Sequence, residues 1–141
     1  MAFLADVNFL VALLHERHTQ SPRASAWLRR HNEEGSVALC RVAQMGALRV
    51  LTNRAWLADE VQSAAEVWRA WDLLGADDRF FLVAAPAQLE SEWRRLTSGW
   101  PRGRMAETDA YFAAFASSGG YRLLSFDKGL RRFPGVELEL P

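Results

Sequence analysis

The chain has 141 residues, half of them hydrophobic, and no net charge, because 17 basic residues balance 17 acidic ones. This length and composition predict a single domain over residues 1–141 with a substantial core. The balanced charge argues against a general nucleic-acid-binding protein, although every base except Lys128 is an arginine, whose guanidinium matches phosphate geometry. A lone Cys40 cannot form an internal disulfide, which fits a reducing compartment. No apolar run approaches the roughly 20 residues that span a bilayer, and the start does not resemble a signal peptide. We therefore expect a cytoplasmic protein without membrane contact.

Apolar periodicity predicts short strands that alternate with helices along the chain. Consecutive apolar residues indicate buried strands, whereas apolar residues three or four apart indicate helices. In chain order we expect strand 3–5, helix 7–14, helix 21–34, strand 36–40, helix 41–51, a connection over 55–59, helix 61–74, strand 79–83, helix 87–96, a loop over 97–104, helix 108–118, strand 121–125 and an edge strand 136–140. This alternation predicts an α/β fold of three α/β/α layers, with a central, mostly parallel sheet of four to five short strands.

Three aspartates lie where an expected strand ends or an expected helix begins. Asp6 follows the first strand, Asp109 opens the last helix, and Asp127 follows the fourth strand. In an open parallel sheet such positions form the ligand crevice. Three carboxylates gathered there repel one another unless a cation lies between them, which indicates a hard divalent metal. Helix capping or a turn explains any one of them alone, but the set of three favours a site.

Four motifs give the chain a family resemblance. They are Asp6-Val7-Asn8 after the first strand, Leu48-Arg49-Val50-Leu51-Thr52-Asn53 at a helix end, Thr108-Asp109-Ala110-Tyr111 at a helix start, and Ser125-Phe126-Asp127 followed by Arg132-Phe133-Pro134-Gly135. In order and spacing they resemble a VapC toxin, the PIN-domain ribonuclease of a toxin–antitoxin pair. The resemblance runs nearly end to end and implies one PIN-like domain over residues 1–141.

The resemblance implies an endoribonuclease that depends on Mg²⁺ or Mn²⁺ and cleaves structured RNA, such as transfer or ribosomal RNA, to inhibit translation. It makes Asp6, Asp109 and Asp127 the catalytic residues and metal ligands. The supporting polar residues that it implies near the metal are Asn8, Thr108 and Ser125. It also implies a cognate VapB-type antitoxin and a homodimer. The chemistry agrees, because hard cations prefer carboxylate oxygens and can lower the pKa of the water that attacks phosphorus.

One position departs from the family pattern. Where such toxins have a glutamate early in the third helix, this chain has Gln44, whose amide oxygen can ligate a metal but brings no negative charge. We expect Gln44 at the fourth-ligand position of the catalytic site, where it limits metal binding. Three explanations stay open: a weakened nuclease or pseudoenzyme, an enzyme that uses one metal and three aspartates, or an engineered inactivating substitution. The alternative function is an impaired PIN domain that binds antitoxin or RNA.

Arginines near the aspartates are candidates for RNA contact. Arg102 and Arg104 lie in the expected loop before Asp109, and Arg131 follows Asp127. From there, their side chains could reach the RNA backbone beside the cleaved bond. The alternative is that they are ordinary solvated charges.

Overall fold

The computed structural model describes residues 1–103 and 106–141. Its centre is a five-stranded sheet with the order β3-β2-β1-β4-β5, in which every pair of neighbouring strands is parallel. The strands are β1 (Phe3–Ala5), β2 (Val37–Leu39), β3 (Phe80–Leu82), β4 (Arg122–Leu124) and β5 (Leu138–Glu139). The predicted α/β fold with a central parallel sheet is therefore confirmed.

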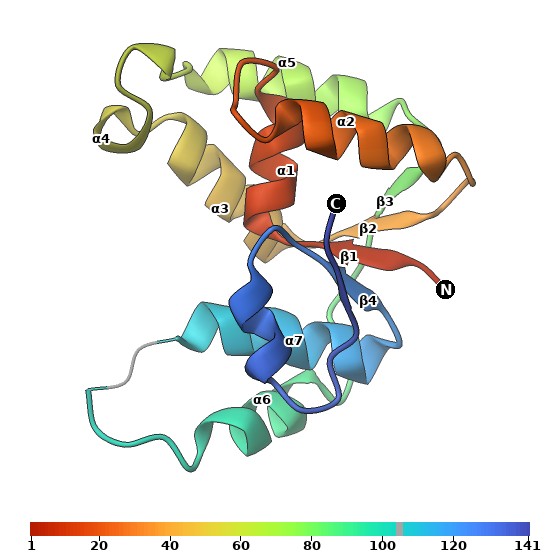
Figure 1. Cartoon of the computed structure of the whole chain (residues 1–141), viewed down its shortest axis with the longest axis vertical. Helices are drawn as coiled ribbons and strands as arrows, with labels where there is room; N and C mark the ends of the chain where they lie inside the picture. The colour runs from red at the N-terminus through yellow and green to blue at the C-terminus, as the bar shows by residue number, and fades with distance from the viewer. Residues whose placement is uncertain (104–105) are drawn as a thin grey trace.

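Helices cover both faces of the sheet (Figure 1). One face carries α1 (Val7–Leu14), α2 (Ser21–Arg30), α3 (Arg41–Leu51) and α5 (Ala64–Gly75). The other carries α6 (Leu89–Thr97), α7 (Glu107–Gly119) and the 3-10 helix η2 (Lys128–Arg132). None of the helices in the described part of the chain has the length and apolar character needed to cross a membrane.

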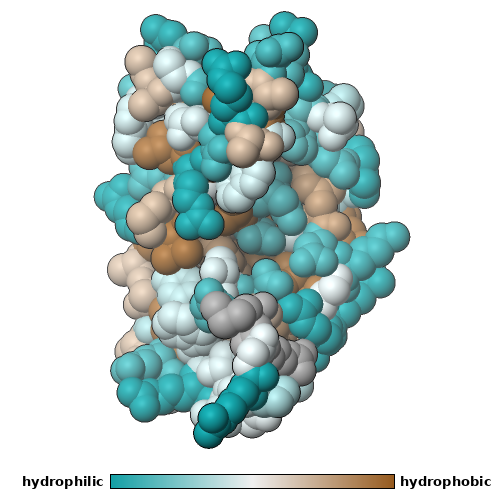
Figure 2. Space-filling view, turned by 90° about the vertical axis from the view of Figure 1, so that its left-hand side faces the viewer, coloured by the Kyte–Doolittle hydropathy of each residue, from teal (hydrophilic) through white to brown (hydrophobic). Residues whose placement is uncertain are grey.

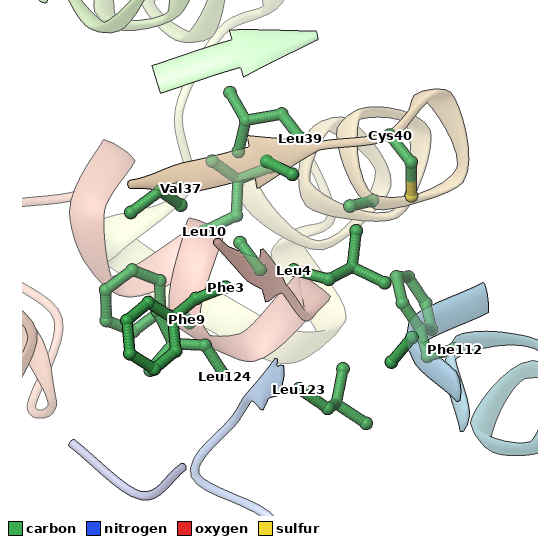
Figure 3. Packing of buried hydrophobic residues seen from close by; sticks show 14 of the residues in the cluster. Phe3, Leu4, Phe9, Leu10, Val37, Leu39, Cys40, Phe112, Leu123 and Leu124 are labelled. Carbon is green, nitrogen blue, oxygen red and sulfur yellow. The ribbon is translucent and has the colours of Figure 1, made fainter. Parts of the chain in front are cut away.

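The core lies between the sheet and these helices. All three residues of β1 are buried, and Leu4 pairs in register with Ala38 of β2 and Leu123 of β4. Such continuous apolar burial is expected for a parallel strand that is covered on both faces. The largest fully buried side chains around it are Trp27, Phe9, Phe112, Phe115, Leu4 and Leu10. Figure 3 shows apolar side chains from β1, β2, β4 and the adjoining helices gathered around this strand.

The structure differs from the sequence-based prediction in one connection and at several helix and strand ends. The expected connection over residues 55–59 instead forms α4 (Arg54–Leu57) and the 3-10 helix η1 (Ala58–Glu60). Its first turn is stabilised because the Asn53 side chain accepts the backbone N–H of Ala55 at 2.9 Å. Among the helices and strands that differ at their ends, α2 stops at Arg30, α5 starts at Ala64, and β5 is only two residues long.

The sheet order positions the candidate site. The chain begins in β1, adds β2 and β3 on one side, and then adds β4 and β5 on the other. The strand order therefore reverses between β1 and β4, and the crevice outside the carboxyl ends of these strands is where open α/β sheets bind ligands. Asp6 directly follows β1, and Ser125 directly follows β4.

Candidate active site

Asp6 is held by hydrogen bonds to both of its carboxylate oxygens. It is the N-cap of α1, where Oδ1 accepts the backbone N–H of Val7 at 2.7 Å. Its Oδ2 accepts the hydroxyl of Ser125 at 2.7 Å. Because one bond comes from the start of α1 and the other from the end of β4, the carboxylate is fixed at the junction of the two elements.

Ser125 and Asn8 link the ends of β1 and β4. The fully buried Ser125 hydroxyl accepts the Asn8 side-chain amide and the backbone N–H of Asp127, both at 3.0 Å. The Asn8 amide oxygen in turn accepts the backbone N–H of Phe126 at 3.1 Å. These contacts place Asn8 and Ser125 where they position the carboxylate of Asp6 and the backbone of Asp127.

The three aspartates line one cleft, which has a volume of about 690 Å³. Asp109 and Thr108 reach it from the first turn of α7, and Asp127 reaches it from the N-cap of η2, where Oδ1 accepts the backbone N–H of Gly129 at 2.8 Å. Asn8 lines the same cleft. The structure thus brings together five of the sequence-predicted site residues in one cleft.

The carboxylates influence one another electrostatically. Burial raises the pKa of the Asp6 carboxyl above its usual value of 3.8, and the hydrogen bonds from Ser125 and Val7 oppose that rise. The negative charges of Asp109 and Asp127 raise the pKa of Asp6 further. A cation between the aspartates would remove this repulsion, because an opposite charge favours the ionised form of a carboxyl group.

The donor chemistry of the cleft fits a hard divalent cation. Among residues 1–103 and 106–141, no three His, Cys, Asp or Glu side chains already lie close enough together to hold a metal ion. Magnesium usually keeps several water ligands and needs only one or two carboxylates, so it does not require a closed cage of protein ligands. The carboxylates of Asp6, Asp109 and Asp127, which face one cleft and repel one another, are therefore suited to a partly hydrated cation.

Asp109 is engaged by an arginine. Nη2 of Arg132 donates to Oδ2 of Asp109 at 2.9 Å, and Nη1 donates to the carbonyl of Gly129 at 2.7 Å. The guanidinium also lies 4.6 Å from the centre of the Phe133 ring. The ion pair is partly exposed, so ions and water can compete with it.

Gln44 is turned away from the other predicted ligands. It is not among the described residues that line the cleft, and its amide oxygen accepts Nη1 of Arg41 at 2.9 Å. The part of α3 that does line the cleft includes Val42, Met45 and Arg49. These three residues are three and four positions apart, a spacing that places them on one helix face.

Two of the predicted RNA-binding arginines, Arg102 and Arg131, lie outside the cleft that the aspartates line. Arg102 and Arg131 are exposed, and neither is among the residues that line the cleft. Arg104 falls outside the described residues.

The cleft also contains residues that the sequence reasoning did not assign to the site. Arg49, Met45, Trp56 and His18 all line it. The shared helix face of Val42, Met45 and Arg49 is visible in the sequence, but that spacing alone does not tell a core face from a cleft wall. No helical spacing identifies Trp56 in the sequence, because it lies in a segment that was expected to be a connection.

Comparison with known proteins agrees with this fold. A family model for the PIN domain matches residues 3–136. Ribonuclease VapC41 of Mycobacterium tuberculosis is 35% identical over 141 residues, covering 97% of each chain. Among solved structures, VapBC2 from Rickettsia felis bound to a fragment of its promoter DNA superposes with a TM-score of 0.74 at 12% identity, over 99% of this chain and 98% of the other. VapC20 of M. tuberculosis, a toxin that cleaves the sarcin–ricin loop, superposes with a TM-score of 0.62 at 16% identity, over 96% and 98%.

The chain therefore belongs to the PIN-domain family. Its similarity to VapC41 further identifies it as a PIN ribonuclease of the VapC type. The resemblance inferred from the four motifs is confirmed.

Proposed function

We propose that the chain is the endoribonuclease toxin of a VapBC-type toxin–antitoxin pair and that it depends on Mg²⁺ or Mn²⁺. The observation that carries the proposal is that Asp6, Asp109 and Asp127 come from three separate elements and meet at one cleft, beside the switch point of the sheet. The 35% identity to Ribonuclease VapC41 over nearly the whole chain supports ribonuclease activity. One PIN-like domain over residues 1–141 is part of the same proposal.

In this mechanism Asp6, Asp109 and Asp127 would hold the cation, and a polar network positions Asp6 and the backbone of Asp127. The bound cation would supply the charge that activates a water molecule and stabilises the negative charge that develops on the phosphoryl group. Ser125 and Asn8 keep Asp6 and the segment of Asp127 in place through the bonds described above. Thr108 would orient the substrate or a water molecule from the cleft wall. Arg132, which forms a partly exposed ion pair with Asp109, would contact an RNA phosphate.

The RNA and protein partners are also proposals. We propose structured RNA, such as transfer or ribosomal RNA, as the substrate, with Arg102, Arg104 and Arg131 binding its backbone. We propose a cognate VapB-type antitoxin and a homodimer as the assembly. The fold shared with the toxin of the R. felis VapBC2 complex is compatible with such a pairing.

The metal requirement is tested by removing and replacing the cation. The purified chain, treated with EDTA and dialysed, should leave a labelled RNA hairpin intact, and the addition of Mg²⁺ or Mn²⁺ should restore cleavage. The reason is that a divalent cation would offset the negative charge of the carboxylates beside the phosphate. The measurement is the initial rate of appearance of cleaved RNA on a denaturing gel. Equal rates in EDTA and in Mg²⁺ would contradict metal dependence.

A second candidate function is an impaired PIN domain that binds antitoxin or RNA without cutting. It is favoured by the uncharged Gln44, whose amide oxygen is already bonded to Arg41. A growth-arrest assay separates the two functions, because arrest that is lost with Asp6→Ala supports the enzyme, whereas arrest that survives this substitution supports a binding module.

The role of Gln44 predicts the behaviour of a Gln44→Glu variant. If this position limits metal binding, the Gln44→Glu variant should bind Mn²⁺ more tightly than the wild type does. It should also cleave RNA faster at low metal concentration. Both follow because a fourth negative charge increases attraction for a divalent cation. Isothermal titration with Mn²⁺ and cleavage rates over a metal series provide the measurements. Identical metal affinity and identical cleavage rates in the two proteins would show that position 44 has no role in metal binding.

A further inference from the structure

The part of the cleft that α3 and α4 line presents large side chains that are exposed to solvent. Trp56 on α4 is 54% exposed and Met45 on α3 is 65% exposed, and both line the same cleft as Asp6, Asp109 and Asp127. Figure 2 shows the side of the molecule where α4 and the start of α7 lie, and its surface is hollowed, with apolar and polar residues adjoining. Exposed apolar groups that adjoin polar ones in this way mark a contact site.

Arg49 adds a positive charge next to Trp56. Its guanidinium carbon lies 5.8 Å from the centre of the Trp56 ring, and Arg49 takes part in none of the ion pairs found among residues 1–103 and 106–141. An aromatic face beside a guanidinium offers the two contacts that a single nucleotide needs. The ring can stack on a base, and the cation can bind a phosphate.

We propose that Trp56 stacks on an unpaired base of the RNA beside the cleaved bond, while Arg49 binds the adjacent phosphate. This inference rests on the proposed RNA cleavage and defines its substrate as a nucleotide segment with at least one unpaired base. The base must be unpaired because both faces of a base within a duplex are covered by its stacked neighbours, whereas a loop can present a base face to an aromatic ring. Trp56 is then a specificity-determining residue in the same cleft as the carboxylates.

The charge beside Trp56 suits RNA. Arg49 is positively charged and adjoins the Trp56 ring, so it attracts a phosphate to the place where the ring can accept a base. A cleft of about 690 Å³ is also within the range of sites that enclose a ligand of drug-like size, so it has room for a nucleotide as well as a hydrated cation.

The test compares Trp56→Ala, Trp56→Phe and Trp68→Ala in the full-length chain. Trp68 is the matched control, because it is 44% exposed on α5 and is not among the residues that line this cleft. With a fluorescein-labelled RNA hairpin as substrate, Trp56→Ala should raise KM about 5- to 150-fold, the equivalent of about 1–3 kcal/mol of lost base stacking, with a smaller change in kcat. Trp56→Phe should restore most of the KM, and Trp68→Ala should leave KM unchanged.

An abasic scan of the hairpin loop distinguishes stacking from a structural role. Removing the stacked base should raise KM for the wild type by about the same factor as Trp56→Ala, whereas the same abasic RNA should add no further penalty in Trp56→Ala. Arg49→Ala should reduce the slope of log KM against log salt by the contribution of about one phosphate. Circular dichroism spectra of the variants should match that of the wild type.

Different failures identify different errors. If the wild type cleaves the hairpin but KM is the same in Trp56→Ala, or the abasic penalty persists there, the stacking role is overturned and the ribonuclease function stands. If Trp56→Ala changes only the elution volume of the protein in size-exclusion chromatography, this part of the cleft is an interface between two copies of the chain and the proposal is also overturned. If the wild type neither binds nor cleaves RNA with Mg²⁺ present, both the proposed function and this inference fall.

Discussion

Asp109→Asn is expected to lower kcat for RNA cleavage by on the order of 10³-fold, while the fold and its stability stay nearly unchanged. The loss follows because one of three carboxylates that would hold the cation becomes neutral, and cation stabilisation of the transition state is worth several kcal/mol, with ~4 kcal/mol equal to about 10³-fold in rate. Stability should change by less than about 1 kcal/mol, because the ion pair with Arg132 that is lost is partly exposed. The measurements are single-turnover cleavage and urea unfolding.

Glu107→Gln is the matched control for this prediction. Glu107 is an exposed acid in the same first turn of α7, and it is not among the residues that line the cleft. The substitution removes the same charge from the same helix end, so it reports the general effect of net charge on RNA binding. If both variants lose activity to the same extent, the loss comes from net charge, and Asp109 has no role of its own in the proposed metal site.

Ser125→Ala is expected to destabilise the protein by about 2 kcal/mol and to lower kcat/KM by about 10- to 100-fold. The substitution removes the hydroxyl that donates to Asp6 and accepts from Asn8 and from the backbone of Asp127, so three polar groups lose a partner at once. The activity falls because the groups that position the proposed metal ligands are lost. Urea unfolding measures the first effect and steady-state kinetics the second.

The same substitution predicts a change in pH dependence. The hydrogen bond from Ser125 lowers the pKa of Asp6, so its loss should raise that pKa further above 3.8. Because the ionised carboxylate is the form that binds a cation, the acid limb of the profile of kcat/KM against pH should move to higher pH. Ser118→Ala is the control, since the Ser118 hydroxyl donates to the carbonyl of Ala114 within α7 and makes no other hydrogen bond to the described residues. An acid limb that stays in place in Ser125→Ala would contradict this account of Asp6.

The parts of the fold that follow from local signals were predicted well. Buried apolar runs at β1 and β2 and the face periodicity of α3 identify these elements in sequence, and α3 has the predicted bounds 41–51. The segment of α4 was missed because it is a single turn, too short to show a period. The start of α5 was placed too early because apolar Val61 extends the pattern, whereas Ser63 caps the helix through the backbone N–H of Glu66 at 3.1 Å.

The site was predictable only in part, for a physical reason. Asp6, Asp109 and Asp127 are identifiable because each lies at the junction of a strand or helix, and the topology of parallel sheets brings such junctions together. The position of Gln44 depends instead on its rotamer and on a hydrogen bond with Arg41, which no spacing rule gives. The contribution of Trp56 depends on how α3 and α4 pack beside α1, and sequence periodicity carries no information about that packing.

The sheet order has a consequence for the time at which the proposed nuclease appears during synthesis. The central strand β1 is made first, yet its neighbour β4 comes near the end of the chain, and the Ser125–Asp6 bond joins residues 119 positions apart. A nascent chain that has not reached β4 lacks Ser125 and Asp127, so its Asp6 has no hydrogen bond from Ser125. Contacts between residues so distant in sequence form late in folding. The proposed nuclease site is therefore completed only when the last part of the chain has been made and has folded onto β1.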